Sequence, residues 1–216
     1  MLLRRLISME FISNKIHECI NQYNSPLFFT SYSTSYISGV PDFKNIINGY
    51  YIDHILDSKF FRQNPEIFFD YLEKIYPWVE LEPNYIHQIL GETQSRVITE
   101  CFDSLHVKAG NKSVIELYGN LNKILCNFCS FEIATSEFLK SNQYSDENYL
   151  CPKCNNMLQP SIILHGQSLK NFNMAVNALH YSDAFIIIGN TPFYYPVNRL
   201  INKALENKCK VLYISI

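Results

Sequence analysis

Apolar side chains recur along the chain with two spacings, one typical of helices and the other of buried strands. Over residues 10–23 they recur every three or four positions, which predicts an amphipathic helix. Short apolar runs bounded by polar residues predict strands at 27–29, 97–98, 114–117, 161–164, 184–188 and 211–214. The run at 184–188 is apolar throughout, as expected for a strand buried in a parallel sheet.

Helical patterns fill most of the chain between these strands. Residues 44–89 are predicted to form helices that three prolines interrupt. One core face of these helices consists of Phe68, Phe69, Leu72 and Ile75. Residues 175–180 belong to another helix, and Pro196 begins the last helix at its first turn. The Ser/Thr-rich residues 30–38 are predicted to form a turn.

Four of the seven cysteines form two pairs with the spacing of metal ligands. Cys126 and Cys129 make one Cys-x-x-Cys motif, and Cys151 and Cys154 make a second one after 21 residues. Two such turns can supply four thiolates to a tetrahedral zinc ion, with no position left open for catalysis. Two disulfides are the alternative for these residues. The chain shows no secretory signal, which favours a structural zinc site over disulfides.

Strands that alternate with helices predict an α/β fold, in which a Rossmann-like parallel sheet has helices on both faces. We expect a large domain made of residues 1–43, 91–120 and 158–216. A helical insertion at 44–90 and a zinc-binding module at 121–157 would together form a small second domain. The fold class is therefore Rossmann-like, with a small zinc-ribbon and helical domain attached.

The composition argues against several classes of protein. The 216 residues are 47% hydrophobic, which argues against wholesale disorder, and a net charge of −2 argues against a nucleic-acid partner. No apolar run approaches the roughly 20 residues that span a bilayer, so we expect no membrane partner and a cytoplasmic protein. The seven glycines are few for a protein that binds nucleotide phosphates through its backbone.

Eight motifs in the order of the chain resemble those of the sirtuins, which are NAD-dependent protein lysine deacylases. Three of them lie at 38–44 (S-G-V-P-D-F-K), at 61–68 (F-R-Q-N-P-E-I-F) and at 83–87 (P-N-Y-I-H). Three more lie at 105–110 (L-H-V-K-A-G), at 114–119 (V-I-E-L-Y-G) and at the four cysteines. The last two are 164–167 (L-H-G-Q), at the family's substrate loop, and 183–196, at its G-T-S turn. The resemblance runs from about residue 25 to the C-terminus.

The resemblance implies zinc at the four cysteines, NAD as cofactor and an acylated-lysine protein as partner. Asp103 lies at a catalytic and cofactor-binding position of the family motif. The other positions that match cofactor contacts are Ser31, Ser33, Ser35, Asp42, Phe43, Cys101, Gly189, Asn190, Thr191 and Ser215. The family also has a further segment beyond the strand that ends this chain, on the adenine side of the cofactor.

Several of these positions depart from the family pattern. Ser31-Tyr32-Ser33 stands where the family has Gly-Ala-Gly, so side chains occupy the place of bare backbone near the pyrophosphate. The hydroxyls could still donate to phosphate, which leaves NAD binding open. Glu100 and Cys101 replace a glutamine and an asparagine, and we expect Cys101 to be a buried thiol. If Tyr32 points between the domains it would block the cofactor, and if it points into the core the cleft would be open.

Tyr118 stands where the family has the histidine that serves as general base. Histidine has an ordinary pKa near 6.5, whereas that of tyrosine lies near 10, so a tyrosine holds its proton at neutral pH. The first hypothesis is therefore a sirtuin-like protein that is catalytically impaired or inactive as a deacylase. The second is an NAD-consuming enzyme with an altered site, such as an NAD hydrolase or ADP-ribosyltransferase. An ordinary deacylase would need another base.

Overall fold

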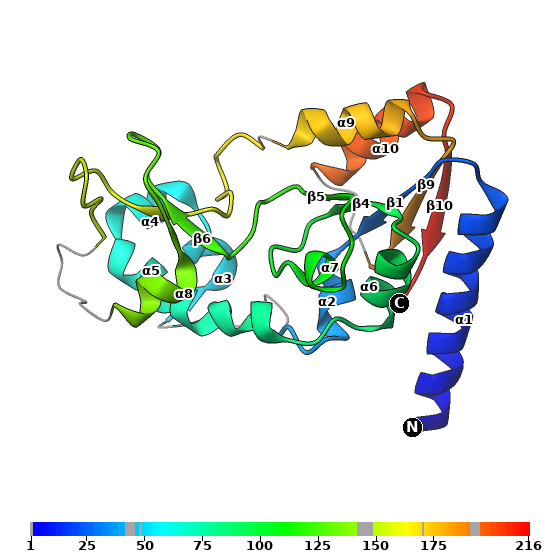
Figure 1. The fold of residues 1–216 in the computed structure, drawn as a ribbon, viewed down its shortest axis with the longest axis horizontal. Helices are drawn as coiled ribbons and strands as arrows, with labels where there is room; N and C mark the ends of the chain where they lie inside the picture. Colours follow the sequence, from blue (N-terminus) through cyan, green and yellow to red (C-terminus); the bar gives the residue numbers. More distant parts are fainter. Residues whose placement is uncertain (1, 42–45, 48, 142–148, 170, 191–194) are drawn as a thin grey trace.

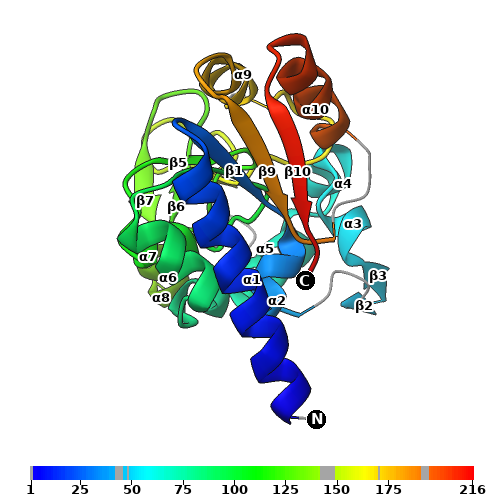
Figure 2. The same ribbon diagram turned by 90° about the vertical axis from the view of Figure 1, so that its right-hand side faces the viewer.

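The computed structural model describes residues 2–41, 46–47, 49–141, 149–169, 171–190 and 195–216. At its centre lies a five-stranded parallel sheet in the order β10-β9-β1-β4-β5 (Figures 1 and 2). The strands are β1 (Pro26–Thr30), β4 (Arg96–Thr99), β5 (Val114–Glu116), β9 (Ala184–Ile188) and β10 (Lys210–Ile214). The parallel registers of all four strand pairs confirm the predicted Rossmann-like architecture.

Helices cover both faces of this sheet because alternate strand residues point to opposite sides. On one face, α9 (Phe172–His180) and α10 (Val197–Glu206) pack on Leu27, Phe29 and Phe185. On the other face, α1 (Leu2–Gln22) and α6 (Tyr85–Glu92) pack on Phe28 and Ile186. In Figure 1, α9 and α10 lie above the strands and α1 lies to their right.

A third hydrophobic cluster, separate from those on the two faces of the sheet, lies beside the carboxyl ends of the strands (Figure 1). The helices at this cluster are α3 (Ile52–Ile55), α4 (Ser58–Gln63), α5 (Pro65–Ile75), the 3-10 helix η1 (Tyr76–Glu80) and α8 (Thr135–Lys140). Two short helices, α2 (Tyr32–Tyr36) and α7 (Leu105–Lys108), lie beside the parallel sheet. A hairpin pairs β2 (Ile46–Ile47) with β3 (Tyr50–Tyr51). A three-stranded sheet contains β7 (Glu132–Ala134), β6 (Lys123–Leu125) and β8 (Gln159–Pro160). The predicted core face of Phe68, Phe69, Leu72 and Ile75 is buried.

Three predicted elements differ from the structure. Residues 46–51, predicted as part of the helices at 44–89, contain the β2–β3 hairpin, and Gly49 between these strands has a φ of +82°, which a helix does not allow. Residues 161–164 do not form a strand, because their backbone bonds go to separate places: Ser161 N donates to Lys123 O and Ile163 N donates to Tyr118 O. The predicted turn at 30–38 contains the helix α2 instead, which Ser31 precedes as N-cap. The division into two domains stays a prediction, although α6, which it assigns largely to the helical insertion, packs on the parallel sheet. In the described part of the chain, no helix is long and apolar enough to cross a membrane.

Candidate functional site

The loops that follow β1, β9 and β10 meet at the carboxyl edge of the sheet. Ser31 N donates to Ile188 O over 3.1 Å, and Gly189 N donates to Ile214 O over 2.9 Å. In open α/β sheets, ligands bind at this edge, where neighbouring strands connect in opposite directions. Here β1 lies between β9 and β4, so the junction of the β1 and β9 loops is such a point.

The two serines at the family's glycine positions close this junction with their side chains. Their hydroxyl oxygens lie 2.7 Å apart, and Asn190 N donates to Ser33 Oγ over 2.8 Å. Gly189 has a φ of +113°, and a Cβ there would collide with Ser31 Oγ. Ser31 is buried, and Asn190 Nδ2 donates to Ile216 O, next to the exposed Ser215. The serine hydroxyls are thus engaged with each other and with the β9 loop.

Ser35, Cys101 and Asp103 form a second, buried group below α2. Ser35 Oγ donates to Asp103 Oδ2 over 2.5 Å and lies 3.0 Å from Cys101 Sγ, while Leu105 N donates to Asp103 Oδ1. Burial raises the pKa of the Cys101 thiol well above its ordinary value, which confirms the predicted buried thiol and disfavours a nucleophile. Burial also raises the pKa of the Asp103 carboxyl, against the opposing effect of these hydrogen bonds. Asp103 therefore holds α2 and the start of α7 together.

Tyr118 belongs to an aromatic cluster that we define as Tyr32, Trp78, Phe102 and Tyr118. The Tyr32 ring lies 5.9 Å from that of Phe102 and 6.4 Å from that of Tyr118, and Trp78 stacks on Phe102 at 6.0 Å. Tyr32 and Tyr118 both pack against the hydrophobic cluster that contains the buried residues of α3, α4, α5 and the cysteine module. The space left among these rings and the neighbouring residues is too narrow for a water molecule; its lining consists of Tyr32, Ser35, Val40, Trp78, Cys101, Phe102 and Asp103.

Glu100 lies directly before this group and is only 1% exposed. Its Oε1 has no hydrogen-bond partner among the described residues, while its backbone N donates to Thr30 O. Burial raises the pKa of the Glu100 carboxyl to about 8. At neutral pH the side chain is therefore mostly protonated and uncharged, which makes it resemble the glutamine of the family motif.

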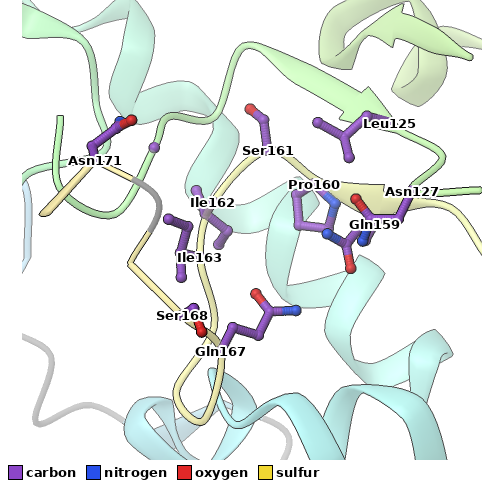
Figure 3. Close-up of a pocket in the computed structure, with 11 residues that line it drawn as sticks. Leu125, Asn127, Gln159, Pro160, Ser161, Ile162, Ile163, Gln167, Ser168 and Asn171 are labelled. Carbon is purple, nitrogen blue, oxygen red and sulfur yellow. The ribbon is translucent and has the colours of Figure 1, made fainter. Parts of the chain in front are cut away.

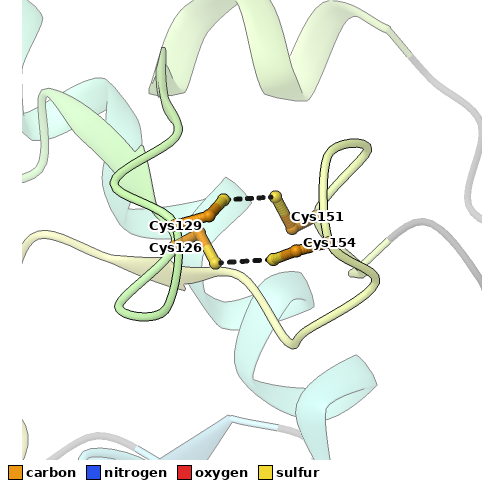
Figure 4. A group of neighbouring side chains, drawn as sticks. All are labelled: Cys126, Cys129, Cys151 and Cys154. Atoms are coloured by element: carbon orange, nitrogen blue, oxygen red, sulfur yellow. Dashed lines mark hydrogen bonds between the residues drawn. The ribbon is translucent and has the colours of Figure 1, made fainter.

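The side chains of the four paired cysteines point toward one another (Figure 4). Their sulfur atoms all lie within 4.8 Å of one another, with Cys126 and Cys154 at 3.5 Å and Cys129 and Cys151 at 3.4 Å. A zinc–sulfur distance of about 2.3 Å places the sulfurs of a tetrahedral site about 3.8 Å apart, so the arrangement fits zinc. All seven cysteines are free thiols, which does not fit the disulfide alternative.

The structure brings most of the predicted site residues to one edge of the sheet, in the two groups given above. Asp42, Phe43 and Thr191 lie outside the described residues. Sequence reasoning missed Phe102 and Trp78 as parts of the site. Phe102 carried a signal. Residues 99–106 resemble the sirtuin motif T-Q-N-I-D-G-L-H, in which the place of Phe102 is held by the smaller isoleucine, whereas Trp78 matches no motif.

Comparisons with known proteins agree with this geometry. The model of the Sir2 family matches residues 32–196. An NAD-dependent protein deacetylase of Thermotoga maritima is 30% identical over 209 residues, which cover 92% of this chain and 85% of that protein. A solved Sir2 structure with a p53 peptide and NAD+ has a TM-score of 0.82 and 26% identity, and covers 93% of this chain and 85% of its own.

One similar solved structure is of special interest for Tyr118. It is described as a Sir2 mutant in which tyrosine replaces a histidine, with a p53 peptide and NAD. Its TM-score is 0.81 at 26% identity, and the match covers 94% of this chain and 86% of that chain.

Proposed function

Because this chain belongs to the Sir2 family, we propose that it is a zinc-binding sirtuin that does not perform NAD-dependent lysine deacylation. The observation that carries this proposal is Tyr118, which stands at the general-base position and packs against Tyr32 in the aromatic cluster. A tyrosine that holds its proton cannot accept one from a ribose hydroxyl, and loss of a positioned base costs about 10²–10⁴-fold in rate. The cluster also fills space at the edge where the family binds NAD.

We propose that Cys126, Cys129, Cys151 and Cys154 hold a structural zinc ion. Zinc would supply a crosslink between the two cysteine turns, and the four-thiolate set leaves no open position for catalysis. A four-cysteine zinc site suits a reducing compartment, which supports the predicted cytoplasmic location.

The test is nicotinamide release from NAD by the zinc-loaded protein with an acetylated-lysine peptide. We expect no release above background. Tyr118→His alone should stay inactive, because Tyr32 still fills the cleft, and the Tyr32→Ala/Tyr118→His pair should be the first to gain activity. Release by the unaltered protein that Asp103→Asn abolishes would overturn the proposal.

A second candidate is an NAD-consuming enzyme that needs no base on the ribose. The Sir2 mutant with tyrosine in place of histidine was solved with NAD and a peptide, so a tyrosine is compatible with both ligands in a relative. Cleavage of the glycosidic bond depends on orientation and charge stabilisation, and Asp103 is retained. Peptide-independent release of nicotinamide would favour this candidate over the first.

A further inference from the structure

Two histidines lie against each other in the protein interior, where α6 meets α7. His87 on α6 is 0% exposed, His106 on α7 is 2% exposed, and the centres of their rings lie 4.5 Å apart. Three of the four ring nitrogens have no hydrogen-bond partner among the described residues. The fourth, His106 Nε2, lies 2.9 Å from Thr30 Oγ1 at the end of β1. Such a pair is tolerated in the interior only while both rings are uncharged.

Protein atoms enclose the histidine pair. Neither ring lines the pocket of about 470 Å³ that lies between the cysteine module and residues 159–163 (Figure 3). Neither ring lines the narrow space in the aromatic cluster. Since both rings are also buried, a change of charge at the pair requires the helices around it to move apart.

Burial sets the charge of both rings. It lowers the pKa of His87 from 6.5 to about 3, and burial together with the neighbouring His87 lowers the pKa of His106 well below 6.5. Both rings are therefore neutral in the folded protein at pH 7. Exposed histidines titrate near pH 6.5, so a state in which the pair is open gains protons and becomes relatively more stable as pH falls below this value.

No described carboxylate stabilises a protonated ring at this position. The described titratable side chains on the elements around the pair are Glu10, Lys15, His17, Glu18 and Cys19 on α1, Tyr32 and Tyr36 on α2, Tyr85 and Glu92 on α6, Arg96 on β4, Glu100, Cys101 and Asp103 after β4, and Lys108 on α7. None of these groups shifts the pKa of either histidine. A proton taken up by the pair would therefore stay uncompensated in the folded protein.

The short helix α7 connects the histidine pair to the aromatic cluster. It begins three residues after Phe102. At its end, Lys108 Nζ donates to Glu80 O over 2.8 Å and to Leu81 O over 2.9 Å. These two carbonyl groups follow closely after Trp78, whose ring stacks on Phe102. A movement of α7 would therefore act on both rings of this stack.

We propose that the His87–His106 pair is an acid-sensitive latch for α7. Protonation of one ring expels it from the interior, α7 moves away from the parallel sheet, and the stack of Trp78 on Phe102 opens while the sheet stays folded. The helix that moves is α7, because it has four residues, whereas α6 is anchored in the hydrophobic core of the sheet. The latch does not depend on the proposed loss of deacylation.

The fluorescence of Trp78 tests the latch, because this is the single tryptophan of the chain and it lies in the aromatic cluster. The full zinc-loaded protein is titrated from pH 7 to pH 4, and far-UV circular dichroism and bound zinc are measured on the same samples. We expect the fluorescence to change at a pH at which the dichroism is still that of the folded protein.

His87→Leu removes one titrating ring and no described hydrogen bond. It should move the midpoint of the fluorescence change to lower pH by about one unit or more, because opening then takes up one proton instead of two. His106→Gln can still bond to Thr30 Oγ1 and should shift the midpoint in the same direction. His17→Leu, at an exposed position of α1, is the control and should leave the midpoint unchanged.

An unchanged midpoint in either folded variant of the histidine pair would overturn the proposal. A fluorescence change that coincides with the loss of dichroism or of zinc in every variant would also overturn it.

Discussion

The cysteine cluster and the carboxyl edge of the sheet have diverged from the family to different degrees. At the cysteine cluster all four ligands are present, and their sulfurs lie at distances that suit zinc. At the sheet edge the fold is equally complete, but two serines, two tyrosines and a phenylalanine occupy space that the family motifs leave to smaller groups or to histidine. The residues that suit a structural metal site are thus retained, whereas those at the edge where the family motifs contact NAD differ.

Loss of metal should have the largest effect on stability. Cys151→Ser removes one ligand and is expected to cost on the order of 5 kcal/mol or more in the free energy of unfolding, because zinc binding and folding of the module are coupled. Cys209→Ser changes a buried thiol outside the cluster and should cost about 1 kcal/mol. Thermal unfolding of both variants, with zinc content measured in parallel, checks the contrast. Equal destabilisation by the two variants would contradict a structural zinc site.

Glu100→Gln should stabilise the sheet edge in a pH-dependent way. In the folded protein the pKa of Glu100 is raised from 4.5 to about 8, so the unfolded chain ionises first and the native state loses stability as pH rises through this range. A glutamine does not ionise, so the variant keeps this stability as pH rises. The gain should be absent at pH 4 and on the order of 3 kcal/mol at pH 7.

Urea unfolding at several pH values measures this gain, with the exposed Glu92→Gln as control. A gain that does not grow between pH 5 and pH 8 would show that Glu100 is ionised in the folded protein.

Removal of one aromatic side chain from each region should change the free energy of unfolding by smaller amounts. Tyr32→Ala removes a half-buried ring that contacts Phe102 and Tyr118, and is expected to cost about 2 kcal/mol. Phe128→Ala, in the cysteine module, removes a ring that is 78% exposed and should cost less than about 0.5 kcal/mol. Chemical unfolding of both variants tests this order, and a reversed order would mean that the aromatic cluster does not stabilise the fold.

The sequence predicted the parallel sheet and the cysteine cluster because both depend on local patterns. The wholly apolar Ala184–Ile188 is a strand with a partner on each side, β1 and β10, and a Cys-x-x-Cys turn brings its sulfurs together by itself. Residues 161–164 have a similar apolar pattern, but no single strand lies beside them to complete a ladder. The aromatic cluster depends on Trp78 and Phe102, which lie 24 residues apart and meet only in the folded chain.

The central claim is that the sheet edge no longer accepts NAD in the manner of the family. Calorimetric titration of NAD into the unaltered, zinc-loaded protein tests it most directly. We predict no saturable binding up to millimolar NAD, and measurable binding only after Tyr32→Ala opens the aromatic cluster. Saturable binding to the unaltered protein with a dissociation constant well below about 1 mM would contradict the account.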